Sequence, residues 1–152
     1  LVEVQALVCQ TNFNMPRRTA AGTDYNRVNL LMAVIEKRLG IRLGDCDAYI
    51  NVAGGMRINE PALDLGIIAA ILSSYRNLAL DSGTICFGEV GLVGEVRAVN
   101  MAEQRVLEAA KLGFGRCILP QVNKRQLGIS AGMLNGMQLI GIQTIHEILG
   151  VL

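Results

Sequence analysis

The order of hydrophobic patterns along the chain constrains its fold more than any other feature. Apolar residues alternate with polar ones, or run together briefly, in segments that predict strands at 1–10, 45–52, 84–90, 93–99, 116–119 and 137–142. Helical spacing of apolar residues predicts helices at 24–39, 61–74 and 101–112, with a short one after residue 144. The polar segment 12–22 predicts a loop. Strands and helices alternate around one hairpin-like pair, which predicts an α+β (mixed α/β) fold.

Signals at the helix ends support this assignment. Thr23 or Asp24 can serve as the N-cap of the first helix. Pro61 suits the first turn of the second helix, where its missing N–H costs nothing. Asn100 and Glu103 have the N-x-x-E spacing of a capping box, which predicts the start of the third helix.

The length of 152 residues predicts a single domain over residues 1–152, and a hydrophobic content of 51% allows a sizeable core. Fourteen basic and thirteen acidic residues give a net charge of +1, so bulk charge does not indicate a polybasic nucleic-acid module. Aromatic residues make up only 4%, which disfavours a stacking platform for single-stranded nucleic acid.

Four cysteines, Cys9, Cys46, Cys86 and Cys117, lie in apolar stretches at long, irregular spacings. There is no C-x-x-C pair and only one histidine, so no metal site is expected. Buried, reduced thiols predict a cytoplasmic protein. No apolar stretch reaches the ~18 residues that span a bilayer, so no membrane association is expected. The chain enters a strand at once, as a domain taken from a longer protein would.

Motifs for nucleotide binding and for serine hydrolases are absent from the sequence. It contains neither G-x-x-x-x-G-K-[ST] nor G-x-G-x-x-G, so no cofactor is expected in this chain. His146 follows the expected cap of the last short helix, and no G-x-S-x-G elbow accompanies it. Ser73 and Ser74 fall late on a helix, far from its positive end, which is a poor place for an activated hydroxyl.

Two carboxylates, Glu60 and Asp64, share a helix face at i and i+4. Paired carboxylates can carry acid–base chemistry. The structural interpretation is the stronger one: Glu60 complements the helix dipole, and Asp64 pairs with a nearby arginine such as Arg57.

Short motifs in a fixed order resemble the C-terminal domain of the RadA (Sms) family of bacterial, RecA-like DNA repair proteins. The matching segments are NMPRR (14–18), GTDYNR (22–27), AVIEKRLG (33–40), VAGGMR (52–57), EPALDL (60–65), GEVGLVGEVR (88–97) and EAAKLGF (108–114). Each is short, but the ordered set is specific. The resemblance runs from residue 1 to about residue 120, and the remainder is compatible with it.

That domain is similar to the proteolytic domain of Lon, an ATP-dependent protease with a Ser-Lys dyad. The resemblance places Ala62 where Lon has its nucleophilic serine and Glu103 where Lon has its lysine. Ala62 has no hydroxyl to attack a carbonyl, and Glu103 cannot act as an amine base. The resemblance therefore implies a Lon proteolytic-domain-like fold that is catalytically degenerate, a pseudo-protease.

The resemblance implies a non-catalytic oligomerisation and DNA-binding domain of a RadA-type, RecA-like ATP-dependent DNA repair and recombination (branch migration) protein. The parent is expected to be a DNA-dependent ATPase that uses ATP, Mg and a structural zinc outside this chain. It is expected to form a hexameric ring and to act with recombination proteins such as RecA. Two alternatives stay open: an active Lon-type ATP-dependent serine peptidase domain, and a purely structural ring scaffold.

A ring could gather basic residues that one near-neutral chain carries sparsely. The predicted DNA contacts are basic residues in loops and at the ends of elements: Arg17, Arg18, Arg57, Arg76, Arg116, Lys124 and Arg125. The adjacent pairs 17–18 and 124–125, beside Pro or Asn in expected loops, are the strongest candidates. Arginine suits bidentate phosphate contact, and few aromatics favour duplex DNA. Binding is expected to be sequence-independent and to weaken steeply with salt.

Overall fold

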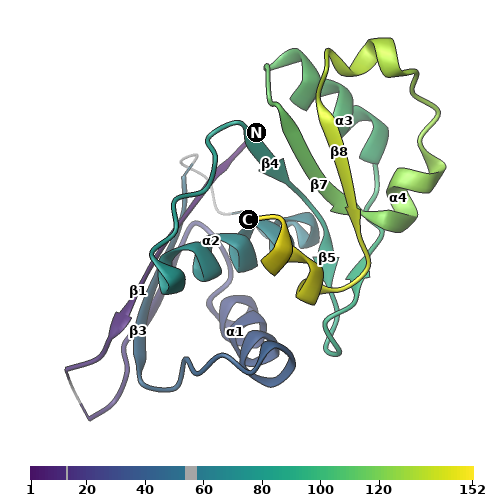
Figure 1. The fold of residues 1–152 in the computed structure, drawn as a ribbon. Coiled ribbons are helices and arrows are strands. Elements are labelled where there is room, and N and C mark those ends of the chain that lie inside the picture. The colour runs from purple at the N-terminus through teal and green to yellow at the C-terminus, as the bar shows by residue number, and fades with distance from the viewer. Residues whose placement is uncertain (13, 54–57) are drawn as a thin grey trace.

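The computed structural model describes residues 1–12, 14–53 and 58–152. Its mixed α/β fold contains three small sheets with strand orders β1-β3-β2, β4-β7-β8 and β5-β6. The first sheet and its helices form one part of the molecule, and the second sheet with α3 and α4 forms the other (Figure 1). The predicted mixed α/β class is confirmed.

The first sheet combines an antiparallel and a parallel pair. Strand β1 (Glu3–Gln10) runs antiparallel to β3 (Cys46–Ala53), whose other neighbour is the parallel strand β2 (Arg18–Ala21). The sequence predicted a loop where β2 lies, and this prediction is wrong. The four residues of β2 show no apolar alternation, and their pairing with β3 is what makes them a strand.

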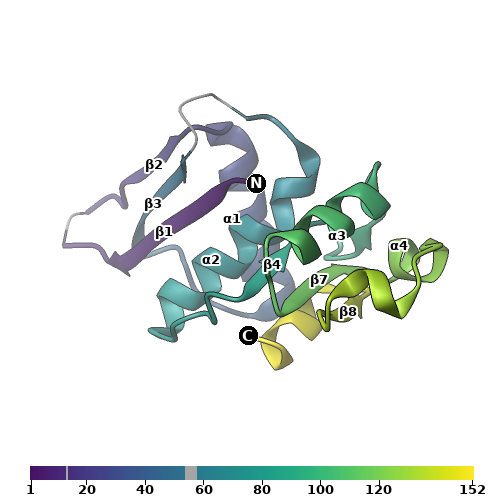
Figure 2. The same cartoon turned by 90° about the horizontal axis from the view of Figure 1, so that it is seen from above.

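Two helices cover one face of this sheet (Figure 2). Helix α1 (Tyr25–Leu39) begins where Asp24 Oδ1 accepts a hydrogen bond from the N–H of Asn26, so the predicted N-cap is confirmed. Helix α2 (Asp64–Arg76) follows a 3₁₀ turn, η1 (Pro61–Leu63). The core between the helices and the sheet is built from fully buried aliphatic side chains, among them Leu31, Ile35, Leu65, Ile68 and Leu72.

The second sheet is parallel throughout and has its own smaller core. Its strands are β4 (Thr84–Cys86), β7 (Arg116–Pro120) and β8 (Gln138–Ile142), and α3 (Ala102–Lys111) packs beside them. The core cluster contains Val106, Ala109, Cys117 and Leu119.

The middle of the chain contains shorter strands than the sequence predicted. The segment expected as one strand over 84–90 splits into β4 and β5 (Glu89–Val90), and β5 pairs antiparallel with β6 (Val96–Arg97). The predicted hairpin-like pair is therefore present but much shorter. Near the C-terminus, η2 (Ala131–Leu134) precedes β8, and the last short helix is the 3₁₀ helix η3 (Ile145–Gly150).

Helix α4 (Gln121–Gln126) was not predicted, because its sequence has no amphipathic period. A side chain explains why it docks. Asn123 is buried on α4, and its amide accepts from the N–H of Val99 and donates to the carbonyl of Val99. These two hydrogen bonds attach the short helix to the segment before α3.

The four cysteines are free thiols in different environments. Cys46 and Cys117 are buried and Cys86 is half-buried, whereas Cys9 is exposed on β1. The prediction of buried thiols is therefore wrong for Cys9, because alternate residues of this edge strand face solvent.

Candidate functional site

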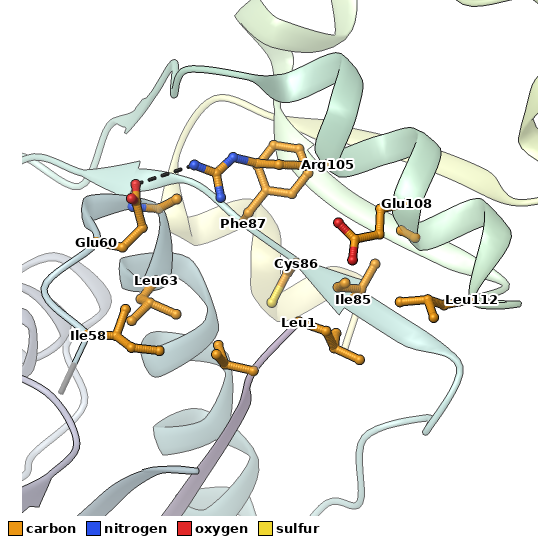
Figure 3. Close-up of a pocket in the computed structure, with 13 residues that line it drawn as sticks. Leu1, Ile58, Glu60, Leu63, Ile85, Cys86, Phe87, Arg105, Glu108 and Leu112 are labelled. Atoms are coloured by element: carbon orange, nitrogen blue, oxygen red, sulfur yellow. Dashed lines mark hydrogen bonds and ion pairs between the residues drawn. The ribbon is translucent and has the colours of Figure 1, made fainter. Parts of the chain in front are cut away.

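A pocket of 230 Å³ lies between the start of α2, strand β4 and helix α3 (Figure 3). Its wall is mainly apolar, and Ala62, the position that the resemblance equates with a nucleophile, lies in it. Three charged residues of the described part of the chain also line it: Glu60, Arg105 and Glu108. Peptidase chemistry at the position of Ala62 would therefore depend on the side chains of this pocket.

The backbone around Ala62 is held from both sides. Glu60, the residue before Pro61, has extended backbone angles, and its Oε1 accepts a hydrogen bond from the N–H of Ala62 at 3.4 Å. The carbonyl of Ala62 accepts from the N–H of Gly88 at 2.9 Å. Ala62 is 3% exposed, so a methyl group is fixed at this position, and it offers no hydroxyl.

Glu103 does not lie in this pocket and does not form a capping box. Its Oε1 accepts a hydrogen bond from the N–H of Gly128 at 2.9 Å. The N-cap of α3 is Met101, in a left-handed conformation (φ 58°) and without a side-chain cap. Asn100 instead accepts a hydrogen bond from Arg105 through its Oδ1. The predicted capping box is wrong, because the chain turns at Met101 rather than at Asn100.

Among the described residues of the pocket lining, Arg105 is the basic one. Its Nη2 lies 3.4 Å from Glu60 Oε1, and its guanidinium carbon lies 5.9 Å from the centre of the Phe87 ring. The ion pair and the ring contact are visible in Figure 3. A guanidinium stays protonated in proteins, so Arg105 cannot replace a lysine as general base. Sequence analysis missed this residue, because its partners lie far away in the chain.

The other thiol and hydroxyl groups do not supply a nucleophile to the pocket: Cys86 lines it, whereas Ser73 and Ser74 lie near the end of α2, outside its lining. Burial raises the pKa of the Cys86 thiol to about 12, so it is protonated at neutral pH. Ser73 Oγ donates to the carbonyl of Leu78, and Ser74 Oγ accepts from the N–H of Val8. These serines support the fold. His146 is exposed on η3.

Asp64 is a structural residue, and its partner is Arg27 of α1. Arg27 Nε donates to Asp64 Oδ1 at 3.0 Å, and Arg27 Nη2 forms an ion pair with Asp64 Oδ2. The N–H of Val90 also donates to Oδ2, at 3.0 Å. The hydrogen bond with Asp64 raises the pKa of Arg27. The suggested pairing of Asp64 with Arg57 is thus corrected, and Arg57 itself lies outside the described residues.

Among the predicted DNA contacts, four are exposed: Arg17, Arg76, Lys124 and Arg125. Arg17 directly precedes β2, and its backbone N–H donates to Asp47 Oδ1. Arg76 is the last residue of α2. Lys124 and Arg125 occupy the last turn of α4, so the expectation that they lie in a loop is wrong.

The other two predicted contacts that the structure describes use their guanidinium groups inside the molecule. Arg18 Nη2 donates to the carbonyl of Leu43 at 2.8 Å, and Arg18 lies in β2 rather than in a loop. Arg116 Nε donates to Thr84 Oγ1, and its Nη1 donates to the carbonyl of Val151 at 2.9 Å. These hydrogen bonds leave fewer donors for a phosphate.

One chain does not bring the predicted contacts together. The sheet that contains Arg18 and the helix that carries Lys124 and Arg125 lie at opposite ends of the molecule in both views (Figures 1 and 2). A basic surface containing both groups requires neighbouring copies of the chain.

Metal binding and membrane insertion find no support in the described residues. Within 1–12, 14–53 and 58–152, no group of three or more His, Cys, Asp or Glu side chains is placed to hold a metal ion. In the same part of the chain, no helix combines the length and the apolar character that crossing a bilayer requires.

Comparison with known proteins places the chain in a family. A family model described as subunit ChlI of Mg-chelatase matches residues 7–123, and the chain belongs to this family of ChlI-like, Lon-protease-like domains.

The chain is also homologous to bacterial proteins called DNA repair protein RadA. It is 50% identical over 151 residues to the one from Halalkalibacterium halodurans, covering 99% of this chain and 32% of that protein. Identity is 50% over 149 residues with the Bacillus subtilis protein, covering 98% of this chain and 32% of the relative. The Synechocystis protein is 44% identical over 151 residues, covering 99% and 29%. The chain thus spans about a third of the length of these relatives, and the predicted resemblance is confirmed.

Proposed function

We propose that this chain is a non-catalytic oligomerisation and DNA-binding domain of a RadA-type, RecA-like ATP-dependent DNA repair and recombination protein. The observation that carries the proposal is that the pocket offers neither the hydroxyl nor the amine of a Ser-Lys dyad at the two matched positions. Ala62, with its backbone held by Glu60 and Gly88, stands where a peptidase of this fold needs a hydroxyl. Glu103 bonds to Gly128 outside the pocket, so the second dyad position is also without an amine.

The relatives' name supports a role in DNA repair, and the exposed basic residues supply candidate contacts. Arg17, Arg76, Lys124 and Arg125 are the leading members of the proposed set, because their side chains are exposed. Arg18, Arg57 and Arg116 complete the set. Hexameric assembly would place copies of these residues around a ring, and phosphate contacts from several subunits would add.

We take residues 1–152 as one domain of a cytoplasmic DNA-dependent ATPase. ATP, Mg and a structural zinc would be bound outside this chain. Branch migration on recombination intermediates, alongside proteins such as RecA, is the process that such a ring would serve.

A binding titration with mixed-sequence duplex DNA tests the proposal. The chain is titrated at several salt concentrations, and light scattering reports its oligomeric state. Replacing Arg17, Arg76, Lys124 and Arg125 by Ala is expected to weaken binding and to reduce the salt slope by roughly 0.9 per lost phosphate contact. The oligomer size should stay the same. Lys37→Ala, which removes an exposed lysine of α1, is the matched control and should leave affinity unchanged.

The same measurements separate the alternatives. An intact oligomer that binds no duplex at low salt would overturn the DNA-binding part and favour a purely structural ring scaffold. A monomer at all concentrations would overturn the oligomerisation part. Hydrolysis of a fluorogenic peptide by the purified chain, abolished by changing Ser73, Ser74 or Ser82 to Ala, would favour an active Lon-type serine peptidase domain; hydrolysis that survives these changes would point to contamination.

A further inference from the structure

A second, larger groove of 730 Å³ adjoins the pocket and runs between β1 and β4. The groove and the pocket share five lining residues, Leu1, Val2, Leu63, Ile85 and Cys86, so they adjoin each other, and the two together are called the depression below. Figure 3 shows the shared part, with Leu1 at the start of the chain below Ile85 of β4. None of the six described residues of the proposed DNA-contact set lines it.

Strand β1 presents an open edge to this groove. It pairs only with β3, and the N–H of Val8 points away from β3 to donate to Ser74 Oγ. In an antiparallel strand, alternate residues direct their backbone groups to the same side. Val4, which lines the groove, lies an even number of residues from Val8 and therefore directs its N–H and C=O groups into the groove. No backbone hydrogen bond joins Val4 to another described residue at this edge.

Strand β4 presents a second open edge from the opposite side. Among the described strands it pairs only with β7. Just after β4, the N–H of Phe87 donates to the carbonyl of Ile118 in β7. The N–H of Gly88 points the other way, to the carbonyl of Ala62. By the same alternation, Cys86 directs its backbone N–H and C=O toward the groove.

A glycine without a side chain forms the floor of the groove between the two edge strands. Gly66 of α2 lines the groove, and a Cβ built on it would lie 3.9 Å from both Val4 Cγ2 and Cys86 Sγ. Gly66 therefore lies between the two edge strands. Ala69 and Ala70 continue this floor with small side chains.

The charges around the depression have one predominant sign. Among the residues that the structure describes, the lining contains four carboxylates, Glu3, Glu60, Asp81 and Glu108, and one basic residue, Arg105. Arg105 is ion-paired with Glu60, so three carboxylates stay without a cation in the lining. This field repels phosphate and attracts lysine or arginine.

We propose that the groove binds an extended, basic-flanked segment of a partner protein as an added β-strand between β1 and β4. The open backbone edges would supply hydrogen bonds on both sides of the segment. Alternate side chains of the segment would be apolar and would lie on the floor at Gly66, and its Lys or Arg residues would meet Asp81 and Glu108. The site contains none of the described residues of the proposed DNA-contact set, so either proposal can fail without the other.

The first experiment uses fluorescence anisotropy with a labelled decapeptide of alternating valine and threonine, with two lysines at each end. Saturable binding is expected. Methylation of the backbone nitrogens of every second residue, in either register, should weaken binding at least tenfold, because each edge loses its acceptor contacts. An effect confined to one register, or none, overturns the two-sided arrangement. Displacement of the peptide by duplex DNA would also overturn the assignment.

The second experiment changes the groove. Gly66→Leu fills the floor and should weaken peptide binding at least tenfold, whereas Gly66→Ala adds one methyl at ordinary contact distance and should keep it. Asp81→Lys with Glu108→Lys should weaken binding by a similar factor at low salt. Asp45→Lys, an exposed acid at the far end of β1, is the charge control. Unchanged affinity in the charge variant, or tighter binding of an acid-flanked peptide, overturns the proposal.

Discussion

Arg27 and Asp64 join two helices across a distance of 37 residues in the sequence, and they do so at the point where α2 begins. The Asp64 side chain is 2% exposed, and Arg27, at 31%, covers it from α1. Arg27 Nη2 also donates to the carbonyl of Val90 in β5, so three elements meet at this pair. This contact therefore ties the first turn of α2 to both α1 and β5.

Arg27→Ala is expected to destabilise the chain by about 3 kcal/mol, because it leaves a buried carboxylate with the N–H of Val90 as its main partner. Arg27 is partly exposed, which places the effect at the low end of the range for buried pairs. Urea unfolding followed by circular dichroism measures the loss. Arg42→Ala, at an exposed arginine, should stay within about 0.5 kcal/mol of the parent. A loss below about 1 kcal/mol for Arg27→Ala would show that the pair is not structural.

The sequence predicted the elements that carry a strong local signal and missed those that depend on distant partners. Helix α1 combines an Asp24 cap with apolar residues at helical spacing, so both its type and its start were predictable. Strand β2 and helix α4 lack such a signal. One forms because β3 offers a free edge, and the other forms where Asn123 bonds to Val99. These partners are 24 or more residues away, so no local pattern could reveal them.

Gly66→Ala is expected to raise stability by about 0.5–1 kcal/mol, because alanine restricts the unfolded chain more than glycine does. The new methyl would lie 3.9 Å from Val4 Cγ2 and Cys86 Sγ, an ordinary contact distance. Gly22→Ala is the opposing case. Gly22 has φ +79°, and a Cβ there would lie 2.3 Å from the carbonyl oxygen of Val52. Equal urea midpoints for the two variants would contradict this account.

The Cys117 thiol gives the protein a pH-dependent stability above neutral pH. Burial raises its pKa from 9.0 to about 12, so the unfolded chain ionises first as pH rises. The contribution is fully present below pH 9.0 and is lost as pH rises through the folded pKa, at about 1.4 kcal/mol per pH unit. Unfolding experiments between these pH values, compared with Cys117→Ala, isolate this slope. Parallel pH profiles for the two proteins would be inconsistent with the shift.

From the sequence, only one property of the candidate pocket was predictable, namely the absence of a serine at position 62. The EPALDL motif, through its resemblance to Lon, pointed to Ala62 in place of a serine, and the structure lines the pocket with that methyl. The charged neighbours could not be read from the motif. Arg105 meets Glu60 from 45 residues away, because α3 and the segment before α2 line the same pocket. Arg105 supplies a positive charge to the pocket because α3 packs beside the segment before α2, and no local sequence pattern reveals that packing.

Arg116→Ala is expected to lower stability by about 1–3 kcal/mol, because hydrogen bonds from a charged donor are stronger than neutral ones. Its Nε–Thr84 Oγ1 and Nη1–Val151 carbonyl hydrogen bonds connect β7 to β4 and to the C-terminal segment. Lys124→Ala, on the exposed side of α4, should change stability by less than about 0.5 kcal/mol. Thermal and urea unfolding of both variants make the comparison. If Lys124→Ala were the more damaging change, the structural assignment of Arg116 would be contradicted.

Restoring the two dyad residue types should not create a peptidase. Ala62→Ser puts a hydroxyl on the pocket wall, but Glu103→Lys puts an amine on a side chain that now reaches Gly128, outside the pocket lining. The cation beside the new hydroxyl would still be Arg105, which cannot accept a proton at neutral pH. The double variant and Ala62→Ser alone should therefore hydrolyse a fluorogenic peptide no faster than the parent, and a fluorophosphonate probe should not label the introduced serine. Labelling of the double variant alone would mean that the residue at position 103 can turn into the pocket, and the assignment of this pocket as catalytically inert by geometry would then be wrong.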